Sequence, residues 1–367
     1  MTQSGQTCRI LMTVDAVGGI WRYAMDLASA LRLEGVETVF AGFGPLPSRR
    51  MIEEAQAVGR LHWSEKPLDW MAGGENELAD IPERLARLAD AEAVDLLHLN
   101  LPSQAAGFAS SRPVVVVSHS CILTWFAAVR RTAPPDDWSW HEAINRDGFG
   151  AADAIIAPSR SHADALSRSY AVRNVDVVHN ASRHIPTRLH KAPYCFAAAR
   201  WWDEGKNAAV LDQAAALISF PLIAAGSVDG PNGEHVDLRH VDHRGELDHR
   251  EAMALMDEAS IFVSPSIYEP FGLAALEAAR SGAVLVLADI PTYRELWRDA
   301  AVFADPSNPR AFASAIDVVA ADRGLRRRLA LAAQERSRHF SLANQSRQML
   351  AVYRRVLDQR SALSAAE

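Results

Sequence analysis

The chain has 367 residues, of which 49% are hydrophobic and 23% charged, and its formal net charge is −7. This composition is typical of a soluble globular protein with one large or about two ordinary domains, and the acidic balance argues against nucleic-acid binding as the main task. Three widely spaced cysteines without a CxxC pair are typical of small buried side chains in a reducing compartment, so we expect a cytoplasmic protein.

Short apolar runs alternate with helical patterns from the start of the chain. We predict strands at 9–14, 37–43, 95–100, 113–119, 151–159 and 174–180, a turn and helix at 18–35, and a helix at 83–94. The run PVVVVSH at 113–119 is rich in β-branched residues, as in a strand that is buried on both faces of a parallel sheet.

A second series of the same kind begins after about residue 185. Strands are predicted at 194–200, 220–226, 260–266, 283–289 and 300–305, and helices at 206–217, 249–259, 271–282 and 290–297. The alternation indicates right-handed βαβ units. The segment 181–193 is polar, carries two prolines and is interpreted as a linker. The sequence therefore predicts an α/β protein with two doubly wound domains and a cleft between them.

The segment SIYEPFGLAALEAA at 266–279 places two acids on either side of a glycine turn. Glu269 falls in a predicted strand-to-helix loop, and Phe271, Gly272 and Leu273 open the predicted helix. Free amides at a helix start bind anions, and glycine allows an anion to approach closely. Glu277 lies about five residues further on, so two acids can hold hydroxyls at both ends of a ligand while amides hold phosphates between them. The alternative is a solvated Glu269 and a Glu277 on the helix face with ordinary partners.

Two further segments follow predicted strands. Arg200 and Lys206 in ARWWDEGKN can neutralise a diphosphate; the alternative is a surface turn with a salt bridge to a neighbouring acid. Gly18 and Gly19 link the first strand to the first helix without forming GxGxxG, which weakens a dehydrogenase interpretation. They either bring backbone close to a ligand or form a tight turn only.

His119 ends a predicted strand and is therefore a candidate for catalysis as well as for a structural role. The segment after it is rich in aromatic residues, which either stack on sugar faces or pack in the core; the candidates for acceptor binding are Trp125, Trp138 and Trp140. The pair Asp136-Asp137 has no further ligand at suitable spacing, so we expect no metal site.

Together these motifs resemble the family 4 retaining glycosyltransferases of GT-B fold, also called glycosyl transferases group 1. The resemblance covers most of the chain, and EPFGLAALE is its most specific part. One departure is the turn HNASR at Asn180, which lacks the family's usual glycine. The resemblance implies two Rossmann-like domains facing across a cleft, with residues 1–185 on the acceptor side, 186–342 binding the nucleotide sugar, and a last helix within 343–367 returning to the first domain.

The resemblance also implies roles for single residues. Glu269 and His119 would contact the transferred sugar, and Glu277 the ribose. Arg200, Lys206 and the amides of Phe271, Gly272 and Leu273 would bind the diphosphate. The Gly18-Gly19 loop would contact the donor, and the turn around Leu247 would pack on the base. Catalysis would rest on Glu269, His119, Arg200 and Lys206.

The implied reaction moves a sugar from a nucleoside-diphosphate sugar, a UDP- or GDP-sugar, to a carbohydrate or glycoconjugate hydroxyl with retention. It needs no cofactor or metal. A sugar-nucleotide epimerase or phosphorylase of similar fold and a non-catalytic sugar-nucleotide binding protein stay open as alternatives. We expect no signal peptide, because the N-terminal residues contain no long apolar stretch, and we expect no membrane span, because no run approaches the roughly 18 apolar residues that one needs. Peripheral membrane contact stays open because residues 323–339 are basic and helical in pattern, although a solvated helix face is favoured.

Overall fold

A computed structural model describes residues 8–108, 110–188 and 190–364. Contacts divide the chain into two compact units. The first unit comprises the described residues up to Ala127, Arg131–Ala181 and the chain from Leu342 onward. The second comprises Ser182–Ser341 together with Ala128–Arg130. Each unit is described below by itself.

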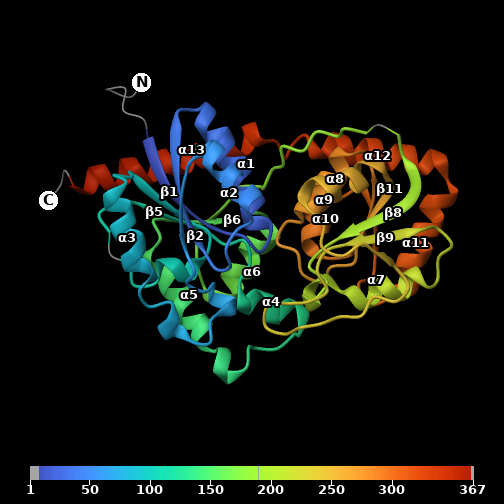
Figure 1. Ribbon diagram of the computed structural model, residues 1–367, viewed down its shortest axis with the longest axis horizontal. Helices are drawn as coiled ribbons and strands as arrows, with labels where there is room; N and C mark the ends of the chain where they lie inside the picture. The colour runs from blue at the N-terminus through green and yellow to red at the C-terminus, as the bar shows by residue number, and fades with distance from the viewer. Residues whose placement is uncertain (1–7, 109, 189, 365–367) are drawn as a thin grey trace. The chain divides into compact units, whose positions relative to one another are not determined.

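The first unit is built on a seven-stranded parallel sheet with the strand order β3-β2-β1-β4-β5-β6-β7 (Figure 1). Its strands are β1 Cys8–Asp15, β2 Val36–Phe43, β3 Arg60–Ser64, β4 Leu96–Leu99, β5 Val114–Val117, β6 Ala154–Ala157 and β7 Val175–Val177. Its helices are α1 Gly19–Leu33, α2 Arg49–Val58, α3 Ile81–Ala91, α4 Ile122–Val129, α5 Trp140–Ala151, α6 Arg160–Tyr170 and α13 Leu342–Ser364. The strands β4 and β5 are fully buried, as expected when helices cover both faces of a sheet.

The second unit has a six-stranded parallel sheet with the order β10-β9-β8-β11-β12-β13. Its strands are β8 Ala192–Ala198, β9 Leu222–Ala225, β10 Asp242–His243, β11 Ala259–Ser264, β12 Val284–Ala288 and β13 Ala301–Ala304. Its helices are α7 Ala208–Ala215, α8 His249–Glu258, α9 Leu273–Arg280, α10 Pro291–Trp297, α11 Pro309–Ala321 and α12 Arg323–Ser337.

Both sheets reverse their strand order at one point. Counted from the first strand of each unit, the order runs 3-2-1-4-5-6, with a seventh strand added in the first unit. Ligands of such sheets bind beyond the carboxyl ends of the strands that flank the reversal. These strands are β1 and β4 in the first unit and β8 and β11 in the second. The two places where a ligand is expected are therefore fixed by topology.

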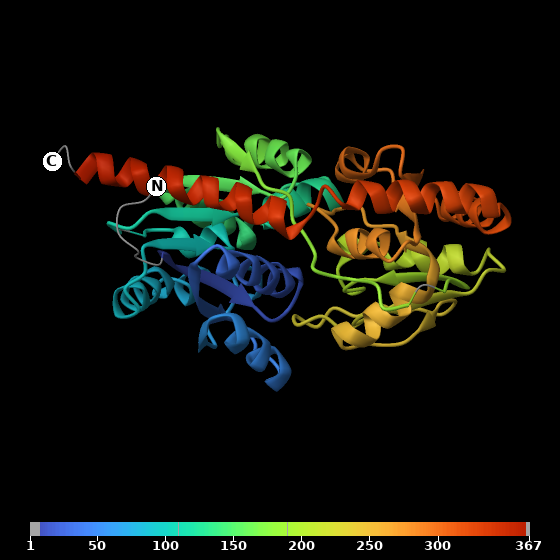
Figure 2. The ribbon, with the colours of Figure 1, turned by 90° about the horizontal axis from the view of Figure 1, so that it is seen from above.

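The last helix returns to the first unit. Figure 2 shows α13 as the long red helix beside the elements of that unit. Its apolar face joins the core that contains β1 and α1 through Met349, Val352, Tyr353 and Val356. Outside this core, Arg355 pairs with Asp176 and Arg360 with Asp153. Within the described residues, none of the helices combines the length and apolar character needed to cross a membrane.

Several elements differ from the sequence-based prediction. The helices α2, α4, α5, α6 and α11 and the strands β3 and β10 were not predicted. The helix α9 begins at Leu273 rather than at Phe271, because Gly272 adopts a left-handed conformation that ends the loop before it. In the basic helix α12, Arg326 and Arg336 donate hydrogen bonds to backbone carbonyls of the second unit, so part of its charge serves packing.

Candidate functional site

Two loops meet where the order of the second sheet reverses. The loop after β8 contains Arg200 and a short 3-10 turn, Glu204–Lys206, and the loop after β11 contains Glu269. The amide of Ile267 donates to the carbonyl of Gly205 at 2.8 Å. Asn207 adopts a left-handed conformation with φ 61°, which asparagine tolerates well. Its side-chain amide donates to the carbonyl of Pro265 at 3.0 Å, which joins the two loops, and to the carbonyl of Pro306 after β13 at 2.8 Å.

This fastening brings a cation and an acid together. The Nζ atom of Lys206 forms an ion pair with Oε1 of Glu269, and each side chain is only 15% exposed. The surface-turn alternative for Lys206, a salt bridge to a neighbouring acid of its own loop, is therefore not what the structure has. An ion pair with so little solvent around it is held more firmly than one on an open surface.

Arg200 behaves differently from Lys206. Its guanidinium lies 3.7 Å from the carboxylate of Asp203 and 5.3 Å from the centre of the Trp202 ring, and its side chain is 39% exposed. This is the local salt bridge that the sequence left open as an alternative. A long exposed side chain of this kind can swing away at small cost, so the arginine remains available to an anion.

The start of α9 is shaped by one glycine. Gly272 has φ +87°, a conformation that side chains rarely adopt. A Cβ atom there would lie 2.8 Å from Cε1 of Tyr293, whose ring is buried. The hydroxyl of Tyr293 is hydrogen-bonded to that of Ser264 at 2.7 Å, and burial raises its pKa well above the ordinary value. The backbone thus approaches closely only because position 272 is glycine.

The other predicted residues of this segment, Phe271, Leu273 and Glu277, differ in their contacts and exposure. The Phe271 ring is buried and packs edge-on against Phe340 with the ring centres 5.5 Å apart, so only its backbone can serve a ligand. Leu273 is the first residue of α9 and is partly buried. Glu277 lies on α9 and is only 6% exposed, with the Ser182 hydroxyl donating to its Oε1 at 3.4 Å. This contact fits the structural alternative for Glu277, a helix-face acid with an ordinary partner, and leaves its role toward a ligand a prediction.

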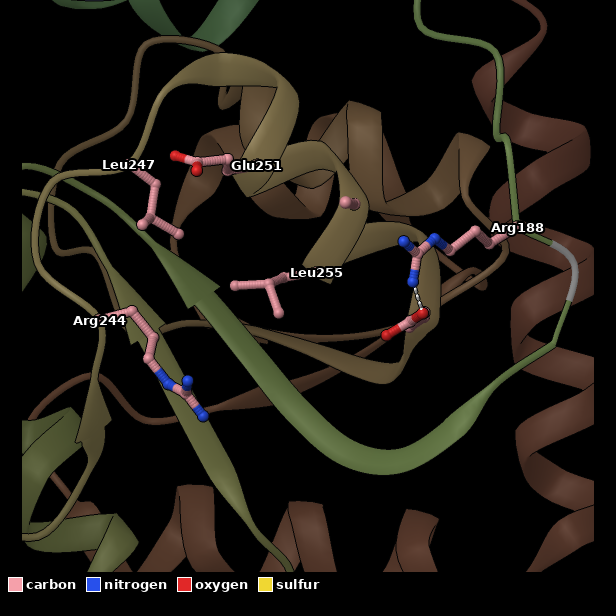
Figure 3. A pocket seen from close by; sticks show the side chains of 7 residues that line it. Arg188, Arg244, Leu247, Glu251 and Leu255 are labelled. Atoms are coloured by element: carbon pink, nitrogen blue, oxygen red, sulfur yellow. Dashed lines mark hydrogen bonds and ion pairs between the residues drawn. The ribbon is translucent and has the colours of Figure 1, made fainter.

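Leu247 lies beside a cavity of about 460 Å³ at α8. Figure 3 shows Leu247 and Leu255 directed toward this space from one side and Arg244 from the other. The cavity is lined by Arg188, Arg244, Leu247, Glu251, Ala254, Leu255 and Glu258. None of the other residues predicted to bind a donor lines it, so Leu247 lines a cavity to which Lys206 and Glu269 do not contribute.

The Gly18-Gly19 loop lies where the strand order of the first sheet reverses. Two polar residues, Asn100 and His119, follow the neighbouring strands β4 and β5. Gly18 precedes α1 in an extended conformation, and the Asp15 carboxylate accepts a hydrogen bond from the Val17 amide at 2.9 Å. His119 follows β5, and its Nε2 lies 2.9 Å from Oδ1 of Asn100, an oxygen that accepts a hydrogen bond. Burial, reinforced by two neighbouring histidines, lowers the pKa of His119 to about 3, so it is neutral at pH 7.

The candidate aromatic residues contact one another. Trp125 lies edge-on to Phe126, and Trp138 and Trp140 stack on His141 with ring centres 5.1 and 3.6 Å apart. All three tryptophans are partly buried. Core packing therefore accounts for part of their surface. Among the described residues there is no group of three or more His, Cys, Asp or Glu side chains that could hold a metal ion.

Sequence reasoning missed the residues that position the others. Asn207 and Tyr293 shape the second-unit loops, and Asn100 holds His119. Asn207 was detectable in part, because asparagine after a short Gly-containing turn favours a left-handed conformation. No signal in the sequence indicated that Tyr293 lies under Gly272 or that Asn100 lies beside His119, because these contacts join residues far apart in the chain.

Comparison with known proteins defines the class. The family model Glycosyltransferase Family 4 matches residues 17–181, and the model Glycosyl transferases group 1 matches residues 234–336. Sucrose-phosphate synthase from Thermosynechococcus elongatus shares 18% identity and a TM-score of 0.76 over 96% of this chain and 100% of its own. Anabaena HepE, solved with UDP and glucose, shares 17% identity and a TM-score of 0.73 over 94% of this chain and 99% of its own. The fold is GT-B, with two Rossmann-like units.

Sequence relatives agree with this class. Glycogen synthase of Mycobacterium tuberculosis is 39% identical over 105 residues, which is 28% of this chain and about a quarter, 25%, of the relative. Alpha-maltose-1-phosphate synthase of Mycolicibacterium smegmatis is 24% identical over 78% of this chain and 85% of its own. D-inositol 3-phosphate glycosyltransferase of Xylanimonas cellulosilytica is 25% identical over 94% of this chain and 93% of its own. The chain belongs to the family 4, group 1 glycosyltransferases, as the sequence resemblance predicted.

Proposed function

We propose that this protein transfers a sugar, with retention of configuration, from a nucleoside-diphosphate sugar to a hydroxyl of a carbohydrate or glycoconjugate. The observation that carries the proposal is the pairing of Lys206 with Glu269 at the reversal of the second sheet, directly before the glycine start of α9. This arrangement supplies a cation, free helix amides and an acid within two adjoining loops, which suits a diphosphate joined to a polyhydroxyl group. The solved complexes of HepE with UDP, with UDP and glucose, and with UDP-glucose make UDP-glucose the first donor to test.

In the proposed reaction the bond between the sugar carbon and the diphosphate oxygen breaks, and the acceptor oxygen bonds to that carbon on the same face. The acceptor's proton passes to the leaving diphosphate. Lys206, Arg200 and the amides at Gly272 and Leu273 stabilise the charge that develops on the leaving group, which is the main catalytic contribution. Glu269, close to the sugar, stabilises positive charge there. For His119 we propose a hydrogen bond to a hydroxyl of the transferred sugar.

The two acids of the glycine motif have separate tasks under this proposal. Glu277 grips the ribose, which is the same in substrate and transition state, so Glu277→Gln should weaken free UDP binding. Glu269→Gln should lower kcat strongly and leave UDP affinity nearly unchanged, because its interaction strengthens only as the bond breaks. Kinetics and calorimetric UDP titration of both variants check this. If both lose affinity alike and keep turnover, the assignment of the two acids is wrong.

The alternatives are separated by following nucleotide release. A thermal-shift screen of UDP- and GDP-sugars identifies the donor, and release of nucleoside diphosphate is then measured with and without candidate acceptors. A transferase releases it in an acceptor-dependent way. An epimerase changes the sugar without release, a phosphorylase needs phosphate, and a binding protein shows a thermal shift with no turnover.

The acceptor is proposed to bind in the first unit near the segment from Trp125 to Trp140. Support comes from the clustering of partly buried tryptophans after a strand end. Trp138→Ala should raise the acceptor KM and spare hydrolysis of the donor. An equal loss of donor hydrolysis would show that the tryptophan acts only by packing on His141.

A further inference from the structure

Three neighbouring strands of the first sheet end in polar residues that contact one another. Thr13 lies near the end of β1, Asn100 directly after β4, and His119 just after β5. Asn100 is 1% exposed and Thr13 is fully buried. Buried polar groups of this kind persist only when each donor meets an acceptor. The hydrogen bonds of the cluster can therefore be used to assign its protons.

The contacts with Thr13 fix the orientation of the Asn100 side chain. The backbone amide of Asn100 donates to Oγ1 of Thr13 at 2.7 Å, and its Nδ2 donates to the Thr13 carbonyl at 2.6 Å. A carbonyl oxygen only accepts, so the atom facing it has to be the amide nitrogen. The opposite atom, Oδ1, is then an acceptor that points toward two histidines.

Both histidines place Nε2 against this one oxygen. Nε2 of His119 lies 2.9 Å from Oδ1 of Asn100, and Nε2 of His98 lies 3.2 Å from it. An acceptor requires a donor, so Nε2 of His119 carries the proton. Nε2 of His98 also lies 3.3 Å from the Tyr23 hydroxyl, which can either donate to it or accept from it. Through its other nitrogen, Nδ1, His98 is hydrogen-bonded to the Tyr353 hydroxyl of α13 at 2.6 Å. Its position is thereby determined from both sides.

His119 differs from His98 in what meets its second nitrogen. Within the part of the chain that the structure describes, no hydrogen bond is made to Nδ1 of His119. The ring is held edge-on against Tyr23, with the ring centres 4.4 Å apart, and the side chain is only partly buried. With the proton on Nε2, Nδ1 presents a lone pair and acts as an acceptor.

We infer that Asn100 is a positioning residue for His119: it fixes the tautomer with the proton on Nε2, so that Nδ1 accepts a hydrogen bond from a hydroxyl of the transferred sugar. This inference rests on the proposed function. In the other tautomer, the lone pair of Nε2 would face that of Oδ1, and a buried acceptor pair of this kind is strongly disfavoured. The sugar would then also meet a donor where its hydroxyl hydrogen points.

The tautomer is tested directly by long-range ¹H–¹⁵N NMR of histidine-labelled protein at pH 7, with His119 assigned through a His119→Gln variant. Wild-type His119 should show a protonated Nε2 and an unprotonated Nδ1. Asn100→Ala should give a mixture of tautomers. Protonated Nδ1 in the wild type, or an unchanged pattern in Asn100→Ala, overturns the inference, and the wild-type result needs no variant to fold.

Turnover tests the consequence for catalysis. With UDP-glucose, or the donor that the nucleotide-sugar screen selects, Asn100→Ala should lower kcat more than tenfold and leave the Kd for UDP within twofold. The matched control is Asn145→Ala, which removes a fully buried asparagine of the same unit on α5. Equal losses of kcat in the two variants overturn the role of Asn100 in positioning. If the wild type turns over no donor while NMR gives the expected tautomer, the proposed function fails and the assignment of the tautomer stands.

Discussion

The glycine at the start of α9 allows the sharpest test of the second-unit site. Gly272→Ala forces a side chain into a conformation with φ +87°, at a cost of about 1–2 kcal/mol for a left-handed residue. The new Cβ also lies 2.8 Å from Cε1 of Tyr293, a ring fixed by burial and by its bond to Ser264. Overpacking in such a place adds about 1–3 kcal/mol. The expected total is about 2–5 kcal/mol of unfolding free energy.

The same helix supplies a matched control at its other end. Gly282 has φ +77°, and a Cβ there would meet only Cε of Lys191, at an ordinary 3.8 Å. Gly282→Ala therefore carries the backbone cost alone, about 1–2 kcal/mol. Urea unfolding of the full chain compares the two variants, and calorimetric titration measures UDP binding. Gly272→Ala should have the lower midpoint and bind UDP at least tenfold more weakly, because the free amides of α9 shift. Equal midpoints and equal UDP affinities would refute the close-approach argument.

Three further outcomes are expected. Lys206→Ala should weaken binding of a nucleoside diphosphate about tenfold or more and leave nucleoside binding unchanged, since charged hydrogen bonds are worth about 1.5–3 kcal/mol; equal losses for both ligands in titration would argue against a diphosphate clamp. Burial lowers the pKa of His98 and of His162 to about 4, so the unfolded chain takes up protons first as the pH falls. The contribution of these histidines to the free energy of unfolding should be complete above pH 6.5 and should fall by roughly 3 kcal/mol for each histidine as the pH approaches 4. A urea midpoint of the wild type that stays constant over this range would contradict the prediction. Asp257→Ala should lower the urea midpoint markedly because the buried carboxylate accepts from the Ser281 hydroxyl at 2.6 Å, whereas Ser281→Ala should cost less.

The parallel strands were predictable because burial on both faces leaves a strong pattern. The valines of 113–119 and the run 283–289 were expected as strands and form β5 and β12. The helix α5 was missed because two glycines, Gly148 and Gly150, interrupt its apolar spacing, and α6 was missed because most of its residues are polar. Gly148 is required by packing, since a Cβ there would lie 1.8 Å from the carbonyl oxygen of Pro102. A contact of that kind between distant segments leaves no local trace in the sequence.

The candidate site, like the fold, was predictable from the sequence only in part. Gly272 was expected to let an anion approach, which stays a prediction; its left-handed conformation was not predicted. The ion pair between Lys206 and Glu269 was not expected, because the residues are far apart in sequence and meet only through the bonds of Asn207 and Ile267 between two loops. The local environment of Arg200 was correctly included among the alternatives, since its acidic partner, Asp203, is close in sequence.

The return of α13 to the first unit has a consequence for biosynthesis. Met349, Val352, Tyr353 and Val356 belong to the same core as β1 and α1, yet they are translated only after the whole of the second unit. The first unit therefore cannot complete its core while the ribosome is still making the second, and Tyr353 reaches His98 only at the end. Until then the apolar surface of β1 and α1 stays open to chaperones. The unit that begins the chain is thus the last to reach its native state.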